Sequence, residues 1–350
     1  MLLPASIMSV PSTIPNPGGP RTEVASVRDL HVHFVGKEST VHAVNGVSFS
    51  LMSGEALCIL GESGSGKTVT LRALMRLLPM RKVQVRGEVR VNGRDIMGLT
   101  EKELALIRGG TVAMIFQEPM TAFDPVYTVG YQIAETIVRH EKVSWNAAHA
   151  QALQLFERVH IPSAKRRLKA YPHELSGGLR QRAMIALALS CKPRILLADE
   201  PTTALDATVQ IQILLLLRSL QKELGMAVVF VTHDIGVAGE IADRLAVMYA
   251  GRFVETGPVR TVMRSPAHPY TKGLLASTVH GGMRGRRLEP IKGSPPNMES
   301  LPDACSFAPR CRYVGEACQN EVPAESWATS EHMARCIRLN EICSERKNFD

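Results

Sequence analysis

Short apolar runs alternate along the chain with longer segments in which apolar residues recur at the spacing of a helix. Short runs bounded by Gly, Pro or polar residues are typical of buried strands. They predict strands at Ala56–Leu60, Val112–Phe116, Ile195–Ala198 and Val228–Thr232. The longer segments predict helices at Lys67–Leu78, Gly177–Ser190, Ala207–Leu224 and Asp234–Ala242. This alternation of strand and helix predicts an α/β fold with a largely parallel sheet.

Two regions depart from the alternation. Residues Val24–Leu51 have the pattern of two strands joined by a short turn, which predicts an antiparallel β subdomain. Residues 120–175 are rich in helical pattern, because Val129–His140 and Trp145–His160 carry apolar residues at helical spacing. We expect this segment to form a helical subdomain inserted in the α/β core.

Composition changes near both ends of the 350-residue chain. The first 20 residues contain five prolines and lack the basic start and unbroken apolar stretch of a signal peptide. We expect residues 1–22 to be a disordered leader. Beyond about residue 258, Pro, Gly and Arg become frequent. We therefore expect a main domain at 23–265 and a C-terminal extension at 266–350, a division that fits the length of the chain.

Charge and cysteine content indicate which ligands and which cellular compartment to expect. The net charge of +8 suits a protein that meets phosphates on nucleotides, lipid headgroups or nucleic acid, and equally a solvated basic surface. No apolar stretch reaches the length of about 18 residues that spans a membrane. We expect a cytosolic location, where the seven cysteines do not form disulfides.

A glycine-rich loop is the first candidate for chemistry. It fits G-x4-G-K-[ST] between a predicted strand and a predicted helix, the context that a phosphate-binding loop (P-loop) requires. Its residues are Gly61, Glu62, Ser63, Gly64, Ser65, Gly66, Lys67 and Thr68. Glycines let the backbone approach phosphate oxygens, and the helix start binds an anion. Lys67 would reach the β- and γ-phosphates of ATP, and the Thr68 hydroxyl would ligate Mg²⁺.

A second piece follows the predicted strand at Ile195–Ala198. Asp199 ends this strand, where its carboxylate could hold Mg²⁺ beside the P-loop. Glu200 comes next and could polarise the attacking water as a general base.

At this point the sequence resembles the ATP-binding cassette (ABC) ATPases. Leu175-Ser-Gly-Gly-Leu-Arg-Gln-Arg182 is similar to the ABC signature. Four further motifs follow the family's order: Phe34 in an A-loop, Phe116-Gln-Glu-Pro119 as Q-loop, Ala204-Leu-Asp206 as D-loop and Thr232-His-Asp234 as H-loop. Leu179 departs from the Met or Gln that is common after Ser-Gly-Gly, and we expect little effect on hydrolysis.

The resemblance implies a role for each motif. Ser176, Gly177 and Gly178 would meet the γ-phosphate on a facing subunit, so that two chains sandwich ATP. Asp206 would bridge the subunits. Gln117 would touch Mg²⁺ and the attacking water, and His233 would contact the γ-phosphate and orient Glu200. Phe34 would stack on adenine. The alternatives are a core aromatic at a strand end for Phe34 and a satisfied core histidine for His233.

A finer resemblance is to the ATPase subunits of oligopeptide/dipeptide importers. It rests on Met114–Pro125, His268-Pro-Tyr-Thr271, Gly293-Ser-Pro-Pro296 and Cys305-Ser-Phe-Ala-Pro-Arg-Cys311. It implies a subunit at the cytoplasmic face of the cell membrane, with a related second ATPase subunit, two permease subunits and an extracytoplasmic binding protein. The same subfamily also serves nickel, glutathione and some sugars, so these substrates stay open.

Four cysteines of the extension form the pattern C-x5-C-x6-C-x17-C: Cys305, Cys311, Cys318 and Cys336. Four thiolates can hold a [4Fe–4S] cluster or a structural zinc ion. The resemblance implies the cluster, whose charge Arg310 and Arg312 would offset. Zinc and free packed thiols remain alternatives. Cys58 and Cys191 have the setting of buried residues, and Cys343 is expected to be free.

Two rival functions follow from the same cassette. A soluble ABC ATPase acting on nucleic acid usually has two cassettes or a long coiled coil, whereas this chain has one cassette and a short insert. The basic runs Lys165–Lys169 and Arg284–Arg287 could bind nucleic acid, but we expect them to face lipid or solvent. An exporter ATPase is the other rival, which the peptide-importer tail disfavours. We expect no nucleic-acid partner.

Overall fold

The computed structural model describes residues 21–118, 121–202, 205–277 and 290–344. Most of the expected leader and the basic run at Arg284–Arg287 lie outside these ranges, as do Pro119 of the Q-loop and Ala204 of the D-loop. Within the described residues no helix is long and apolar enough to cross a membrane.

An eight-stranded mixed sheet forms the centre of the described structure. Its strands, in spatial order, are β11 (Ser326–Thr329), β12 (His332–Ala334), β10 (Arg252–Pro258), β9 (Arg244–Tyr249), β3 (Ala56–Leu60), β8 (Ala227–Thr232), β7 (Ile195–Asp199) and β6 (Val112–Ile115). The five strands from β9 to β6 are parallel, and the three at the other edge pair antiparallel. The predicted parallel core is confirmed.

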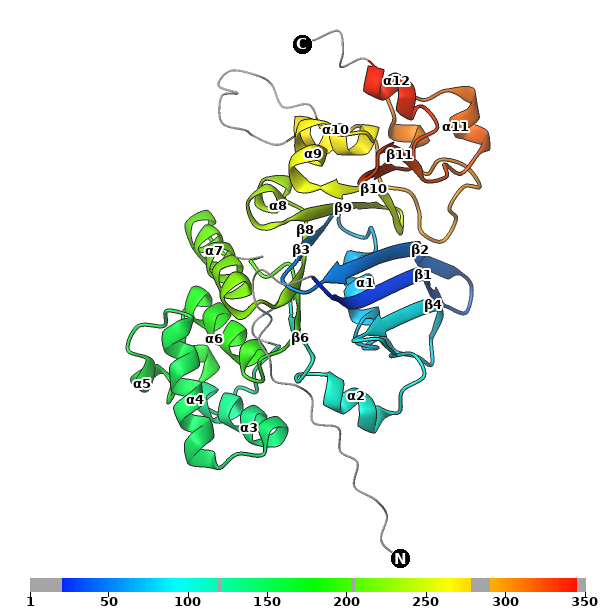
Figure 1. The fold of residues 1–350 in the computed structure, drawn as a ribbon. Coiled ribbons are helices and arrows are strands. Elements are labelled where there is room, and N and C mark those ends of the chain that lie inside the picture. Colours follow the sequence, from blue (N-terminus) through cyan, green and yellow to red (C-terminus); the bar gives the residue numbers. More distant parts are fainter. Residues whose placement is uncertain (1–20, 119–120, 203–204, 278–289, 345–350) are drawn as a thin grey trace, which may run out of the picture.

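A second, antiparallel sheet covers one face of the core (Figure 1). It contains β2 (Thr40–Met52), β1 (Glu23–Val35), β4 (Val83–Val91) and β5 (Arg94–Asp95). The two strands expected in Val24–Leu51 are β1 and β2, joined by residues 36–39. β4 and β5 were not predicted, because their short apolar pattern is interrupted by charged residues.

The helices surround the two sheets. They are α1 (Lys67–Ala73), α2 (Glu101–Ile107), α3 (Val129–Glu141), α4 (Trp145–Arg158), α5 (Ala164–Arg167), α6 (Gly177–Leu189), α7 (Ala207–Leu224), α8 (Ile235–Ile241), α9 (Val259–Arg264), α10 (Pro269–Ala276), α11 (Glu316–Asn320) and α12 (Leu339–Ser344), with 3-10 turns η1 (Pro172–Glu174) and η2 (Ala308–Arg310). The helix predicted at Lys67–Leu78 is shorter than expected. It ends at Ala73, and Arg76, three residues later, adopts a left-handed φ of 48° and donates from its guanidinium to the carbonyl of Leu99.

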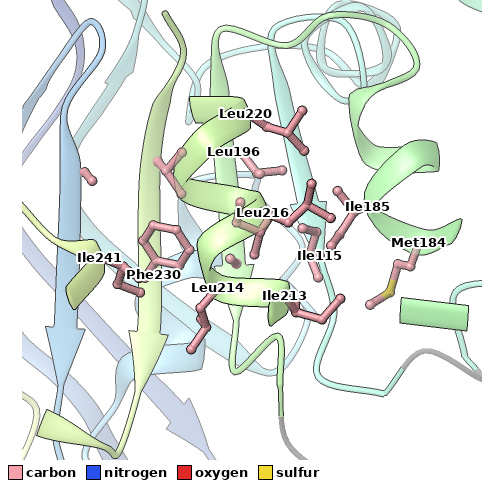
Figure 2. Close-up of a cluster of buried hydrophobic side chains, with 14 of the residues drawn as sticks. Ile115, Met184, Ile185, Leu196, Ile213, Leu214, Leu216, Leu220, Phe230 and Ile241 are labelled. Atoms are coloured by element: carbon pink, nitrogen blue, oxygen red, sulfur yellow. The ribbon is translucent and has the colours of Figure 1, made fainter. Parts of the chain in front are cut away.

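Strand alternation divides the core into two layers. On β7, Leu196 faces the helical layer and Leu197 faces the antiparallel sheet. Figure 2 shows the helical layer, where side chains of α7 meet Phe230 of β8 and Ile185 of α6. α7 begins at its Asp206 cap and ends at Gly225, whose φ of 61° suits a helix terminus. This packing holds the ends of the parallel strands in fixed positions.

The helical subdomain lies to one side of the core sheet (Figure 1). It contains α3, α4 and α5, and α3 packs against α4 along their buried faces. The helix predicted at Trp145–His160 stops at Arg158, and His160 has a left-handed φ of 56°.

The C-terminal extension is joined to the core rather than appended to it. β12 pairs with β10, so two strands of the extension continue the central sheet. The buried Glu255 of β10 accepts hydrogen bonds from the backbone of Ala267 and His268, and contacts His332 of β12 at 2.7 Å. One carboxylate thus connects β10, the start of α10 and β12.

Candidate nucleotide-binding site

Four predicted site segments lie at the carboxyl ends of neighbouring parallel strands. The P-loop follows β3, His233 follows β8, Asp199 ends β7 and Gln117 follows β6. Adjacent parallel strands end at the same edge of a sheet, which is where open α/β sheets bind ligands. The strand order β3-β8-β7-β6 therefore gathers segments that are far apart in the sequence.

The P-loop glycines are required by close backbone contacts. A Cβ on Gly61 would lie 2.3 Å from the carbonyl oxygen of Met248, and one on Gly66 would lie 2.3 Å from that of Ala43. Gly64 and Gly66 also have positive φ values of 79° and 106°. These positions exclude side chains and leave the loop backbone close to a bound phosphate.

Lys67 is buried at the first position of α1, and burial lowers the pKa of its ammonium group. Its Nζ donates to the carbonyl oxygens of Gly61 at 2.8 Å and Glu62 at 2.9 Å. The ammonium therefore sits inside the curve of the loop. The buried Ser65 hydroxyl has no hydrogen-bond partner among the described residues, as expected in a cradle shaped for an oxyanion.

Thr68 and Asp199 form the candidate Mg²⁺ pair. The Thr68 hydroxyl donates to Oδ1 of Asp199 at 2.8 Å. Asp199 is 2% exposed, and its burial raises the pKa of the carboxyl group. A hydroxyl and a carboxylate oxygen are ligands that Mg²⁺ accepts, so these two residues fit the ion.

Glu200 and His233 form the candidate catalytic pair. Oε2 of Glu200 lies 3.4 Å from Nδ1 of His233. The Glu200 backbone has a left-handed φ of 44°, and its N–H donates to Val231 on the next strand. Backbone strain of this kind is common where a side chain must be aimed at a reaction. The His233 side chain is 61% exposed, which removes the core-histidine alternative.

The remaining predicted residues are placed separately. Gln117 is exposed beyond β6. Phe34 is the second-last residue of β1 and is partly buried against the core between the sheets, so its packing leaves both adenine stacking and the core alternative open. Ser176 caps the start of α6, and a Cβ on Gly178 would lie 2.9 Å from Val209 of α7. Asp206 accepts from the Val209 backbone at 3.0 Å.

Two residues that touch the P-loop were not identified as site residues from the sequence. The hydroxyl of Tyr270 accepts a hydrogen bond from the Glu62 backbone at 2.9 Å. The guanidinium of Arg310 contacts both carboxylate oxygens of Glu62, at 2.8 and 3.0 Å. Both belong to segments that matched the peptide-importer subfamily, but neither segment carries a phosphate-binding pattern of its own.

The four cysteines of the extension line one small cavity, which also touches Phe307 and Arg338. Burial raises the pKa values of Cys305, Cys311 and Cys336, the last to about 12. Because their pKa values are raised, these three thiols are protonated, and metal binding has to displace their protons.

The cavity has the donor atoms for a metal group but little room for one. Four convergent thiols are a suitable donor set for iron–sulfur or zinc. The cavity volume is about 10 Å³, close to that of one water. In the part of the chain that the structure describes, no group of His, Cys, Asp or Glu is arranged to hold a metal ion. The residue chemistry fits a metal group, but its binding requires the four side chains to open around it.

The parallel sheet, the P-loop and the residues at the strand ends define an ATP-binding cassette. Comparison with protein families agrees. The ABC transporter family matches residues 44–203, and the oligopeptide/dipeptide transporter C-terminal region matches residues 254–318. The chain therefore belongs to the ABC transporter family and contains this C-terminal region.

Individual relatives match nearly the whole chain. The dipeptide transport ATP-binding protein DppD of Bacillus subtilis (strain 168) is 46% identical over 315 residues, covering 90% of this chain and 94% of the relative. The oligopeptide transport ATP-binding protein OppD of Salmonella typhimurium (strain LT2) is 44% identical over 321 residues, covering 92% and 96%.

A solved structure supports the same assignment. The dimeric post-hydrolysis state of the ATP-binding cassette MJ0796, bound to ADP and phosphate, has a TM-score of 0.61 and 29% identity. The match covers 67% of this chain and 99% of that chain. The predicted family and fold are confirmed, and the protein is an ATP-hydrolysing subunit of an ABC transporter.

Proposed function

We propose that this subunit powers the import of di- and oligopeptides across the cell membrane. The carrying observation is the C-terminal region at residues 254–318, which is the part of the chain that typifies oligopeptide/dipeptide transporters. Relatives named for dipeptide and oligopeptide transport align over both the cassette and this region. In this proposal residues 23–265 are the ATPase domain and residues 266–350 are the peptide-importer extension.

The residues at the strand ends then have definite roles in hydrolysis. Lys67 exchanges its P-loop carbonyl contacts for phosphate oxygens, which are stronger partners for a buried ammonium. Thr68, Asp199 and Gln117 would hold Mg²⁺, which when bound would neutralise charge on the phosphates. These contacts position the γ-phosphate beside the pair formed by Glu200 and His233.

Glu200 acts as the general base. Its carboxylate takes a proton from water as the water oxygen bonds to the γ-phosphorus, and the bond to the ADP oxygen breaks. His233 keeps Glu200 in place through the 3.4 Å contact and reaches the γ-phosphate from its exposed position. Phe34 stacks on adenine at the end of β1.

A second ATPase subunit completes the site. Ser176 and Gly177 are exposed at the start of α6, where free backbone N–H groups suit an anion. With Gly178 they would contact the γ-phosphate held by the P-loop of the facing subunit, and Asp206 would lie at the junction. The cassette MJ0796, which is similar in structure, is dimeric.

An exposed aromatic stack in the helical subdomain supports docking to permease subunits. Tyr127 and Tyr131 stack with ring centroids 5.2 Å apart, and Tyr131 stacks on Trp145 at 5.3 Å. The three side chains are 38–49% exposed, which is unusual for large aromatic residues unless they meet a partner. Through these contacts the subunit would be held at the cytoplasmic face of the membrane, and an extracytoplasmic binding protein would deliver the peptide.

For the extension we propose a [4Fe–4S] cluster on Cys305, Cys311, Cys318 and Cys336. Support comes from their shared cavity, from the cationic side chain of Arg338 that lines it, and from Arg312, which lies over the Tyr313 ring of the same lining. The cluster would supply cross-links between loops of the extension. Anaerobic purification should give a brown protein with iron and sulfide in equal amounts. A protein with one zinc per chain, or with metal-free thiols, would contradict the cluster.

The test of the import function is ATP hydrolysis by the full complex in lipid, with binding protein and a peptide mixture. Peptide should stimulate hydrolysis, and Glu200→Gln should abolish it. Glu240→Gln, an exposed change on α8, is the matched control and should behave as wild type. Stimulation by nickel, glutathione or a sugar instead of peptide would reassign the substrate. Stimulation by nucleic acid without permease would reject transport.

A further inference from the structure

The P-loop is held from outside by the C-terminal extension. Arg310 donates from both Nη atoms to the Glu62 carboxylate, at 2.8 and 3.0 Å, across 248 positions of sequence. Tyr270 accepts from the Glu62 backbone N–H at 2.9 Å. A bidentate contact and a backbone contact together fix both ends of this one P-loop residue.

The Arg310 side chain is itself fixed. It is 5% exposed, and its Nε donates to the Lys292 carbonyl at 3.1 Å. Its guanidinium lies over the Tyr249 ring, 5.8 Å from the centroid, and Nη1 approaches the Tyr249 hydroxyl at 3.4 Å. Hydrogen bonding to Glu62 raises its pKa further, so the charge is permanent.

The support behind these contacts is an aromatic cluster. Phe307 meets the Tyr249 ring edge-on at 5.2 Å and lies 5.4 Å from the Tyr270 ring. Tyr270 is fully buried, and Tyr249 and Phe307 are nearly so. The cluster therefore joins β9, α10 and the segment before η2, and it carries Arg310 toward the P-loop.

The negative charge of Glu62 indicates what its contact with Arg310 does for nucleotide binding. A carboxylate on a loop that binds triphosphate repels the ligand, and the cost is larger where the site is partly buried. The Glu62 side chain is 27% exposed, and its own backbone carbonyl contacts Lys67. A fixed, paired guanidinium removes most of this repulsion without occupying the phosphate site.

We propose that Arg310 is a positioning residue for nucleotide binding. It neutralises Glu62 and orders the P-loop, so that the affinity for ATP depends on the folded C-terminal extension. Arg310 does not touch the reacting atoms, and its action is transmitted through Glu62. The proposal rests on the ATP site alone and needs neither the peptide substrate nor the metal cluster.

The test is a double-variant cycle on the full-length chain, with Mg-ATP affinity measured by calorimetry. Arg310→Gln leaves Glu62 unpaired and should weaken ATP binding about tenfold, within the usual range of coupling between sites. Glu62→Gln should bind ATP at least as tightly as wild type. The double variant should recover most of the loss, because it removes the unpaired charge.

The matched control is Arg244→Gln. Arg244 also forms a 2.9 Å ion pair with a glutamate, Glu55, but at the opposite end of β3 from the P-loop. This variant should lower the melting temperature and leave ATP affinity unchanged.

Three results would overturn the proposal: unchanged affinity in Arg310→Gln, no recovery in the double variant, or an equal loss of affinity in Arg244→Gln. The last two would show a role in stability only. Because no peptide or permease is present, failure here is distinct from failure of the import function.

Discussion

The P-loop and the cysteine cavity are both small sites, but they are assembled differently. The P-loop lies in eight consecutive residues, and its contacts come largely from backbone and from one lysine. The cavity draws its thiols from loops and short helices between residues 305 and 336. A contiguous motif determines its own geometry, whereas dispersed side chains depend on the fold that brings them together.

The two sites also differ in how they treat charge. The nucleotide site buries a cationic Lys67 and an acidic Asp199, and burial shifts both pKa values toward the neutral forms. The cysteine cavity is bordered by Arg338, and burial raises the pKa values of three of its thiols. The nucleotide site has its ligand-binding residues already in place, whereas the cysteine cavity is closed to about 10 Å³. The contact between Arg310 and Glu62 connects the two.

The largest expected effect is a loss of hydrolysis at the nucleotide site that leaves the cysteine cavity unaffected. Glu200→Gln should reduce hydrolysis by about 10²–10⁴-fold, since a general base is removed. ATP affinity and any visible absorbance of the extension should be unchanged, and Glu240→Gln should match wild type. Single-turnover assays would measure hydrolysis, calorimetry would measure ATP affinity, and a visible spectrum would measure the absorbance. A loss of absorbance in Glu200→Gln would contradict the separation.

Phe34→Ala tests whether the adenine contact belongs to the nucleotide site or to the core. Loss of a stacking partner should weaken ATP binding about tenfold, in line with the energy of base stacking on an aromatic ring. Affinity for triphosphate without a base should not change. If instead the melting temperature falls and ATP affinity holds, Phe34 is a core residue.

A smaller effect is expected when the cavity is altered at a distance from the P-loop. Cys311→Ser should abolish bound iron and, because Arg310 precedes it, weaken ATP binding by about fivefold. Cys191→Ser, at the end of α6, is the control and should change neither quantity. Iron analysis and nucleotide titration give the result. Iron loss with unchanged ATP affinity would show that the sites are independent.

The smallest expected effect on stability concerns the buried carboxylate of Asp199. Asp199→Asn should raise the free energy of unfolding at neutral pH without Mg²⁺ or ATP, because burial raises the Asp199 pKa. A raised carboxyl pKa lowers stability above the folded-state pKa, and the cost disappears below the ordinary value. The difference between variant and wild type should therefore shrink as pH falls.

Urea melts across this pH range would check the sign, and hydrolysis should be lost in the same variant. If Asp199→Asn is less stable than wild type at neutral pH, the aspartate contributes more as a partner of Lys67 than it costs by burial.

Much of the fold could be predicted because apolar spacing is a local property. The run Ala56–Leu60 is β3 without change, and Ala207–Leu224 is α7, since both are buried and bounded by clear end signals. Boundaries failed where a tertiary contact intervened, as at Arg76, whose side chain bonds to Leu99. β11 and β12 were missed because they are short, and pairing with β10 supplies their stability.

The sequence by itself determined the P-loop and the order of the cassette motifs, because each is a run of neighbouring residues whose backbone makes the contacts. Only the tertiary structure decided that Glu200 meets His233, that four cysteines share a cavity, and that Arg310 reaches Glu62. Those contacts depend on strand order and on packing between segments that lie apart in the sequence, by 248 positions for Arg310 and Glu62, which no local pattern records.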